Sequence, residues 1–385
     1  VFVEKGYPRY KGIVGGAGTY AKTFANELVN RGFKVSVICG RLDGKQKSFK
    51  DGEINVYPDY EYHPISYFIR YIPIIKVLSK LFRYLENGYN INRIISKINA
   101  IHKITYIEFT EGGDFWTSLL KKHHYISHLH GSSYTIKKLS GRKFLLSDWL
   151  QRQAELYFIK KANIVVAPSK VMSSHVSNEF KGKIKPLTIP YPLSDKLIQK
   201  SANGINRMTT QSNKINIIFA SRNDPVKGGE LLIDTLKILP RSIKNDINVK
   251  IFGYRPKIDV SDIEFIDLND FIPKEQLLIE YENSDICVIP SLFDNSPNTV
   301  YEAMALGKIV VASNVGGIPE IIGNKGCGFI FQSNNINDFK EKLIDAINLI
   351  SNNKHSSMIQ NAKARINKYA DLHKNVNQRL ALLKL

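Results

Sequence analysis

The chain has 385 residues, of which 43% are hydrophobic and 23% charged, a composition typical of a soluble globular protein rather than a disordered one. This length exceeds what one hydrophobic core usually holds, so two domains are expected. No run of 18 or more apolar residues occurs, and no membrane-spanning helix is predicted. The first residues, VFVEKGYPRY, lack the pattern of a signal peptide, so a cytoplasmic location is expected.

The net charge of +19 is concentrated in the first half of the chain. Residues 1–200 hold 32 Lys and Arg against 15 Asp and Glu, whereas residues 201–385 hold 22 against 20. Such a half could attract nucleic acid, an anionic membrane surface or a phosphorylated substrate, or could be a solvated surface without a partner. Cys39, Cys287 and Cys327 are far apart without paired spacing, so neither a disulfide nor a zinc site is predicted.

Both halves alternate short β-branched runs with longer segments of helical period, the pattern of parallel sheets built from βαβ units. The predicted strands cover residues 1–4, 34–40, 104–109, 125–130 and 163–169, and then 215–221, 248–253, 263–267, 286–291, 309–313 and 328–332. This pattern predicts an α/β protein with two Rossmann-like domains.

The expected domain boundaries follow from composition. Residues 1–193 form the first domain, residues 194–214 are polar enough for a linker, and residues 215–365 form the second domain. The last stretch, residues 366–385, has helical period and either completes the second domain or returns to the first.

A glycine-rich loop and an amphipathic segment, GIVGGAGTYAKTFANELVNRG, follow the first predicted strand. Gly15, Gly16 and Gly18 permit tight turns and close approach of the backbone to a ligand, and the start of the next helix favours an anion. Glycine used only for packing explains the loop about equally well. The spacing differs from the dinucleotide fingerprint and no acid ends the second strand, which removes the main support for an oxidoreductase.

Basic and polar residues follow several other strands, at the carboxyl ends where ligands of parallel sheets bind. His130 ends YISHLH and precedes Gly-Ser-Ser, whereas Arg222 and Lys227 follow INIIFAS in the turn RNDPVKGG. A guanidinium and an ammonium there could neutralise a diphosphate, although each could also be an ordinary solvent-exposed cation. For the histidine, a structural role is about as common as a functional one.

The segment PSLFDNSPNTVYE places Asp294 and Glu302 on either side of a strand-to-helix turn. Ser296 is the predicted N-cap and the following proline the first helical residue, so backbone N–H groups near Asn298 and Thr299 are expected beyond the strand end. A carboxylate inside an apolar helix needs a hydrogen-bond partner, which sugar or ribose hydroxyls would supply. The alternative is a capping aspartate and a solvated glutamate.

These motifs closely resemble the retaining glycosyltransferases of family 4, which have the GT-B fold of two Rossmann-like domains facing a central cleft. The resemblance covers nearly the whole chain and is most specific in ICVIPSLFDNSPNTVYEAMALGKIVVASNVGGIPEII. It implies that the second domain holds a nucleotide-sugar donor and that the C-terminal helix returns to the first domain.

Carried over to this sequence, the resemblance assigns a role to each matching position. The diphosphate would contact Arg222 and Lys227, with Gly16 approaching the phosphates, and the ribose would contact Glu302. The remaining positions implied for the donor are Gly253, Tyr254, Phe271 and Ile272 at the base, Asn298 and Thr299 at the phosphate or sugar, and His130 and Asp294 at the reacting sugar. Asp294 stands where the family usually has glutamate.

The resemblance also implies a mechanism in which the leaving diphosphate assists deprotonation of the acceptor. The protein then supplies position and charge, so no metal ion and no other cofactor is expected. Two other classes stay open: a GT-B sugar-nucleotide epimerase, and a basic nucleic-acid binding protein, for which no recognised module is present.

The acceptor is expected to be a glycan or a lipid-linked molecule bound by the basic first domain. Residues 62–103 interleave aromatic, isoleucine and basic residues with only one acid, Glu86, which is typical of a helix at an anionic membrane surface and also of a core helix with a cationic outer face. Glu111, which follows another strand of the first domain, is the candidate acceptor contact. A peripheral position at the inner face of the plasma membrane would follow from a membrane contact.

Overall fold

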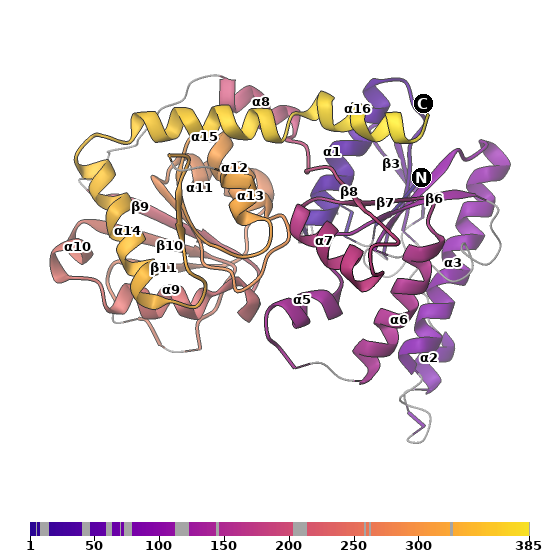
Figure 1. The fold of residues 1–385 in the computed structure, drawn as a ribbon, viewed down its shortest axis with the longest axis horizontal. Helices are drawn as coiled ribbons and strands as arrows, with labels where there is room; N and C mark the ends of the chain where they lie inside the picture. The colour runs from indigo at the N-terminus through magenta and orange to yellow at the C-terminus, as the bar shows by residue number, and fades with distance from the viewer. Residues whose placement is uncertain are drawn as a thin grey trace. The chain divides into compact units, whose positions relative to one another are not determined.

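The computed structural model describes residues 1–4, 6–7, 15–40, 47–58, 64–69, 71–72, 79–111, 123–143, 146–202, 214–257, 259–261, 263–323 and 326–384. They form two compact units (Figure 1). Unit 1 comprises residues 1–189 and 374–385, and unit 2 comprises residues 190–373.

Unit 1 is built on an eight-stranded sheet with the order β3-β4-β2-β1-β5-β6-β7-β8. All neighbouring strands pair in parallel except the hairpin of β3 and β4. The strands are β1 (Phe2–Val3), β2 (Ser36–Ile38), β3 (Phe49–Asp51), β4 (Ile54–Tyr57), β5 (Tyr106–Thr110), β6 (His124–His128), β7 (Ile164–Ala167) and β8 (Leu187–Thr188).

The helices of unit 1 come mostly from the first half of the chain. They are α1 (Gly16–Asn30), α2 (Pro64–Ile69), α3 (Ser79–Ile101), α5 (Ser133–Leu139), α6 (Leu146–Lys161) and α7 (Lys170–Glu179), joined by α16 (Leu372–Leu382) from the C-terminus. Isoleucines on one side of α3 are buried with the strands in one core cluster, as the helical period of this segment requires.

Unit 2 contains a six-stranded, all-parallel sheet with the order β11-β10-β9-β12-β13-β14. Its strands are β9 (Ile215–Ala220), β10 (Ile247–Phe252), β11 (Ile266–Asn269), β12 (Ile286–Ile289), β13 (Ile309–Ser313) and β14 (Phe329–Phe331). The central strand β12 is buried along its whole length, which explains why its sequence is a continuous apolar run.

The helices of unit 2 alternate with these strands along the chain. They are α8 (Asp195–Ala202), the short 3₁₀ helix η2 (Pro225–Lys227), α9 (Gly229–Lys237), α10 (Arg241–Asn245), α11 (Lys274–Glu282), α12 (Asn298–Ala305), α13 (Ile318–Ile322), α14 (Ile336–Ser351) and α15 (Ser356–Tyr369). Helices α9 and α14 bury their apolar sides in the same core cluster as the strands.

Several expected boundaries differ from those of the structure. Residues 195–202 of the expected linker form helix α8 in unit 2, and residues 203–213 lie outside the described residues. The C-terminal segment of unit 1 begins at residue 374 rather than 366. The hairpin of β3 and β4 and the short strand β8 were not predicted, and the strand expected at 263–267 lies at 266–269.

Candidate functional site

The strand order of unit 2 identifies where a ligand is expected. From β9 the chain continues to β10 and β11 on one side, and then returns to place β12, β13 and β14 on the other side. The neighbours β9 and β12 therefore mark the switch point of the sheet, and ligands of such sheets bind beyond the carboxyl ends of the strands at this point. The loops after these two strands carry three of the four predicted catalytic residues.

These two loops are fixed against each other by backbone contacts. Leu292 N–H donates to Val226 O at 2.8 Å. Gly228 has φ +74°, and a Cβ at this position would lie 1.8 Å from Pro290 O. Only glycine allows this approach, because any side chain would overlap the neighbouring backbone. The RNDPVKGG turn is thus held directly beside the end of β12.

This arrangement brings Lys227 and Asp294 together. The Lys227 ammonium lies 2.5 Å from Asp294 Oδ2, and the side chains are 25% and 14% exposed. The backbone of Asp294 is fixed as well, because its carbonyl accepts from Gly317 N–H at 3.1 Å and a Cβ on Gly316 would lie 1.7 Å from it. Asp294 is one methylene shorter than the glutamate usual at this position, but in this fixed loop it still contacts the Lys227 ammonium directly.

Arg222 stands apart from this pair. Its side chain is 60% exposed and forms a loose ion pair, 3.9 Å from Asp224 Oδ2. Asp224 itself caps η2 by accepting from Val226 N–H at 3.1 Å. An exposed guanidinium at the end of β9 is available to an anionic group arriving from solvent.

Helix α12 begins one residue later than predicted. Pro297 is its N-cap and Asn298 its first residue, with Thr299 second. The predicted cap, Ser296, is buried, and its hydroxyl bonds to the Tyr301 hydroxyl at 2.9 Å, so the prediction of this cap was wrong. The half-buried Asn298 and Thr299 still occupy the first turn, where backbone N–H groups favour an anion.

Glu302 lies in the second turn of α12 and is 2% exposed. Its Oε2 forms an ion pair with the ammonium of Lys274, the first residue of α11. Sequence reasoning did not single out Lys274, because nothing in the local pattern shows that the start of α11 meets the second turn of α12.

The positions expected at the base lie after β10 and β11. Gly253 has φ +72°, and its N–H donates to Asn269 O at 3.0 Å. Phe271 is 42% exposed and Ile272 half-buried. Tyr254 is buried instead: its ring fills the space over Gly229 and its hydroxyl donates to Glu230 Oε1 at 3.0 Å. Its side chain therefore belongs to the core of unit 2.

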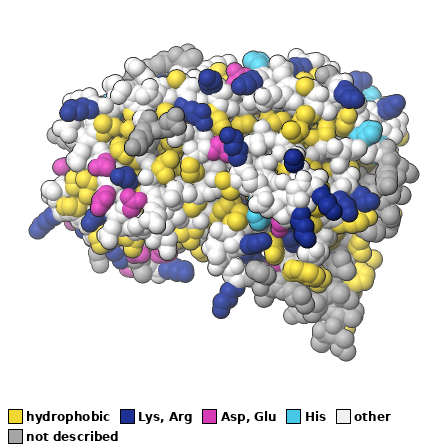
Figure 2. All heavy atoms as spheres, viewed as in Figure 1, with side chains coloured by type: hydrophobic (Ala, Val, Ile, Leu, Met, Phe, Trp, Pro, Cys, Tyr) yellow, Lys and Arg dark blue, Asp and Glu magenta, His cyan; other side chains and the backbone are white. Residues whose placement is uncertain are grey.

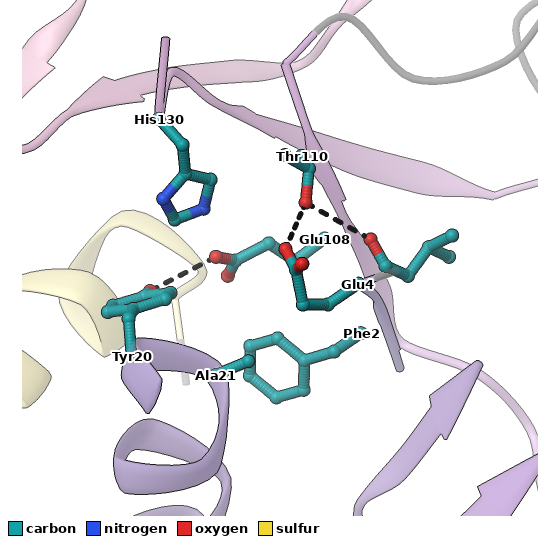
Figure 3. A pocket seen from close by; sticks show the side chains of 8 residues that line it. Phe2, Glu4, Tyr20, Ala21, Glu108, Thr110 and His130 are labelled. Atoms are coloured by element: carbon teal, nitrogen blue, oxygen red, sulfur yellow. Dashed lines mark hydrogen bonds between the residues drawn. The ribbon is translucent and has the colours of Figure 1, made fainter. Parts of the chain in front are cut away.

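Unit 1 has a corresponding switch point between β1 and β5, the neighbours from which the chain proceeds in opposite directions. A small pocket lies there (Figure 3), with a lining of Phe2, Val3, Glu4, Tyr20, Ala21, Glu108, Thr110 and His130. The Tyr20 hydroxyl donates to Glu108 Oε1 at 3.0 Å, and the Thr110 hydroxyl donates to a carboxylate oxygen of Glu4. The predicted His130 lines this pocket, but the two glutamates were not predicted.

A buried ion network lies next to this pocket. Arg379 of α16 is 2.7 Å from Glu108 Oε2, and neutral His128 donates from Nδ1 to Oε1 at 2.9 Å. Burial opposes ionisation of Glu108, but Arg379 and His128 together hold its pKa well below the usual range. Burial lowers the pKa of His128 to about 4. Burial, together with the neighbouring His128, also lowers the pKa of His130. His130 is therefore neutral near pH 7.

Glu111 follows β5 directly and has a left-handed backbone with φ +59°, unusual for a residue with a side chain. Its carboxyl accepts from Gly131 N–H, one residue after His130. Burial, reinforced by the nearby Glu155 carboxylate, raises the pKa of Glu111 to about 8. At neutral pH this carboxyl is mostly protonated and can donate as well as accept.

The glycine loop is described from residue 15 onward. Gly15 is the N-cap of α1 and Gly16 its first, exposed residue. Gly18 lies inside the helix, where a Cβ would be 1.7 Å from Gly6 O. Packing of α1 against the backbone after β1 therefore requires Gly18, whereas Gly16 is exposed at the start of the helix.

A metal centre and a membrane-spanning helix would each leave a recognisable pattern in the described residues. Among these residues, no group of three or more His, Cys, Asp or Glu side chains is placed to hold a metal ion. In the same part of the chain, no helix is both long and apolar enough to cross a membrane.

Comparison with known proteins agrees with this arrangement. The profile of Glycosyltransferase Family 4 matches residues 14–190, and the profile of Glycosyl transferases group 1 matches residues 205–365. An uncharacterized glycosyltransferase of Methanocaldococcus jannaschii is 26% identical over 318 residues, which cover 78% of this chain and 82% of that protein.

Solved structures show the same fold at low identity. Sucrose-phosphate synthase from Thermosynechococcus elongatus aligns with a TM-score of 0.76 and 15% identity, covering 100% of this chain and 98% of that one. Anabaena HepE in complex with UDP aligns with a TM-score of 0.62 and 16% identity, covering 99% and 97%. The two α/β units, each with polar groups at its switch point, thus define a GT-B enzyme. The chain belongs to the family 4 glycosyltransferases.

Proposed function

We propose that the chain is a retaining glycosyltransferase that moves a sugar from a UDP- or GDP-sugar to a glycan or lipid-linked acceptor in the synthesis of a cell-surface polysaccharide or glycolipid. The contact of Lys227 with Asp294 at the switch point of unit 2 carries this proposal. In the proposed site the Lys227 ammonium neutralises the diphosphate and the Asp294 carboxylate accepts from sugar hydroxyls, as transfer from a nucleotide-sugar requires. The similar Anabaena HepE structure contains UDP, which supports the choice of donor class.

In the proposed reaction the bond between the anomeric carbon and the diphosphate breaks, and the acceptor oxygen bonds to the same face of that carbon. The acceptor proton passes to the leaving diphosphate. Arg222 and Lys227 stabilise the charge on this group, and neutral His130 and Asp294 orient the donor sugar through hydrogen bonds. Since these cations supply the positive charge, the proposal includes no metal ion and no further cofactor.

The acceptor is assigned to unit 1. Glu111, whose raised pKa keeps its carboxyl protonated near neutral pH, can donate to an acceptor oxygen as well as accept from a hydroxyl. The pocket beside it is lined by hydroxyl, carboxylate and imidazole groups, which suit a hydroxyl-rich acceptor. The clearest assay is transfer of labelled sugar to a mixed glycan and lipid acceptor fraction.

A contact with an anionic membrane surface forms part of the proposal, and helix α2 supports it. Large apolar side chains on and just after α2 are 47–71% exposed, namely Ile65, Tyr67, Phe68, Tyr71 and Ile72. The lone acid of residues 62–103, Glu86, is turned onto the start of α2, where its two oxygens accept from Ile65 N–H at 2.7 Å and Ser66 N–H at 3.0 Å.

Glu86, the one acid of residues 62–103, is engaged at the start of α2, whereas the outer side of α3 carries exposed cations such as Arg83 and Lys97. Figure 2 shows apolar side chains at the surface at the lower right, the region where Figure 1 places α2. The exposed apolar cluster of α2 and the basic residues of α3 together suit the headgroup region of an anionic bilayer. The enzyme would then be cytoplasmic and peripheral at the inner face of the plasma membrane.

Thermal stabilisation by a panel of UDP-, GDP- and ADP-sugars tests the donor, because a ligand that binds the folded chain raises its melting temperature by mass action. An assay of sugar transfer then distinguishes the candidate functions from one another. An epimerase would convert the donor without any acceptor, and a nucleic-acid binding protein would shift DNA or RNA in a gel without responding to nucleotide-sugars. Failure of every nucleotide-sugar to stabilise the chain would contradict the proposed function.

A further inference from the structure

The ion pair between Glu302 and Lys274 joins two helices at the proposed nucleotide site. Glu302 is 2% exposed, whereas the side chain of Lys274 is 31% exposed. Among the described residues, Lys274 is the only one that contacts the Glu302 carboxylate through an ion pair or hydrogen bond of its side chain. The interaction thus connects a buried acid to a cation at the surface of unit 2.

Burial makes this single partner important. A carboxylate buried in an apolar helix is costly unless a counter-charge or hydrogen bonds compensate for the lost water. Tyr281 and Cys287 are two titratable groups near Glu302; both are fully buried, and burial is the main cause of their raised pKa values. Both stay neutral, so neither replaces the charge of Lys274.

The ion pair leaves hydrogen-bond capacity on the Glu302 carboxylate. A carboxylate accepts about four hydrogen bonds through its two oxygens, and the ammonium contacts Oε2. Lys274 also follows the Phe271–Ile272 segment, which is expected at the base, by only two residues. The lysine therefore links the segment proposed to read the base to the acid proposed to read the ribose.

We infer that Lys274 is a positioning residue for ribose recognition. Its ion pair orients Glu302 so that the carboxylate accepts hydrogen bonds from the 2′- and 3′-hydroxyls of a ribonucleoside diphosphate. This inference rests on the proposed function, because it requires a nucleotide donor in unit 2. It goes further by naming the feature that the site distinguishes, a ribose rather than a deoxyribose.

The test compares binding of UDP and GDP with binding of their 2′-deoxy forms by calorimetry. The variants are Lys274→Gln, which removes the charge, and Lys274→Arg, which keeps it. Lys250→Gln is the matched control, because Lys250 also pairs with an acid of α11, Glu280, at 2.8 Å, without touching Glu302. The melting temperature of each unliganded variant shows whether it is folded.

We expect the wild-type chain to bind one ribonucleoside diphosphate about tenfold or more tightly than its 2′-deoxy form, the effect of one hydrogen bond to a charged group. Lys274→Gln should weaken binding of the ribose form about tenfold and bring the ratio close to one, whereas Lys274→Arg and Lys250→Gln should keep the ratio.

Three outcomes with Lys274→Gln would overturn the inference while leaving the proposed function intact. An equal loss for both forms would make Lys274 a phosphate contact. Tighter binding would make it a competitor of the ribose, and unchanged affinity and ratio would make it a surface cation. If the wild-type chain bound neither UDP nor GDP, the proposed function would fail and this inference with it.

Discussion

The ammonium of Lys227 lies 2.5 Å from the carboxylate of Asp294, two side chains that come from the loops after the neighbouring strands β9 and β12. Lys227 and Asp294 meet because close backbone contacts fix both loops. Gly228 packs against Pro290 O, and Gly316 packs against the Asp294 carbonyl. The Asp294 carboxylate therefore reaches the Lys227 ammonium directly.

Removal of the Lys227 ammonium should abolish most of the sugar transfer activity. Lys227→Ala is expected to lower kcat by about 100-fold to 1,000-fold, the usual effect of deleting one group that stabilises a developing charge. Arg222→Ala should act in the same direction, whereas Lys237→Ala, which changes an exposed lysine of α9, should have no effect. Initial rates with saturating donor measure this, and full activity of folded Lys227→Ala and Arg222→Ala variants would refute the assignment.

Restoration of the family's usual acid should not improve the enzyme. Asp294→Glu adds a methylene to a side chain that already contacts Lys227, and the fixed backbone cannot retreat. We expect kcat to fall about tenfold or more, because displacement of a positioning group by about 1 Å can cost that much. A variant as active as the wild type would show that the loop relaxes.

Gly316→Ala tests the backbone contact that fixes the loop of Asp294. Gly316 has φ +54°, and its Cβ would overlap the Asp294 carbonyl, so both backbone strain and a clash are introduced. We expect a loss of about 2 kcal/mol or more in the free energy of unfolding, together with a lower kcat. Gly326→Ala is the control in the same unit, because its φ is +97° but its nearest neighbour would be a side-chain atom at 3.5 Å. Equal melting temperatures for the two variants would contradict this account.

The sequence was sufficient to predict the strands that build both sheets, because buried parallel strands such as β12 read as continuous apolar runs. It was less informative where exposed or short elements are involved. The hairpin of β3 and β4 was missed although glycine, a common hairpin residue, stands first in its two-residue turn, Gly52-Glu53. Gly52 has φ +61°, a left-handed value that glycine adopts readily.

The positions of candidate site residues were predictable where they directly follow a strand, and not where side chains meet through the fold. The positions of Arg222, Lys227 and Asp294 beyond strand ends could be predicted for this reason. The partners Lys274 and Arg379 could not, because each reaches its buried glutamate from a helix distant in the sequence. Their detection requires the tertiary packing of α11 and α16.

The exposed apolar cluster of α2 should support membrane binding. Cosedimentation with anionic phosphatidylglycerol vesicles is expected, with release by salt because the neighbouring charges are basic. The double variant Tyr67→Ser with Phe68→Ser should weaken binding about tenfold or more, since it removes two large apolar groups. Ile238→Ser, which changes an exposed apolar residue of unit 2, is the control. Absence of binding at low salt would rule out this contact.

The network of Glu108, His128 and Arg379 should make unit 1 sensitive to acid. The pKa of His128 is lowered to about 4 by burial, so the folded state binds fewer protons than the unfolded state, where a histidine has a pKa of about 6.5. Its contribution to stability is therefore present above about pH 6.5 and is lost as pH falls towards 4, by an amount on the order of 3 kcal/mol. Glu108, whose pKa is also depressed, adds a loss below its unfolded value of about 4.5.

His128→Asn should flatten the dependence of the unfolding free energy on pH between 6.5 and 4, because asparagine does not titrate. Arg379→Met should lower stability at all of these pH values by about 3–5 kcal/mol, since it leaves the Glu108 carboxylate buried without its cation. Urea unfolding at a series of pH values, followed by the fluorescence of the chain's two tryptophans, measures both effects. His373→Asn, a change outside this network, is the control. If the unfolding free energy of the His128→Asn variant depends on pH as steeply as that of the wild type, and the variant unfolds cooperatively, the acid sensitivity arises elsewhere in the chain.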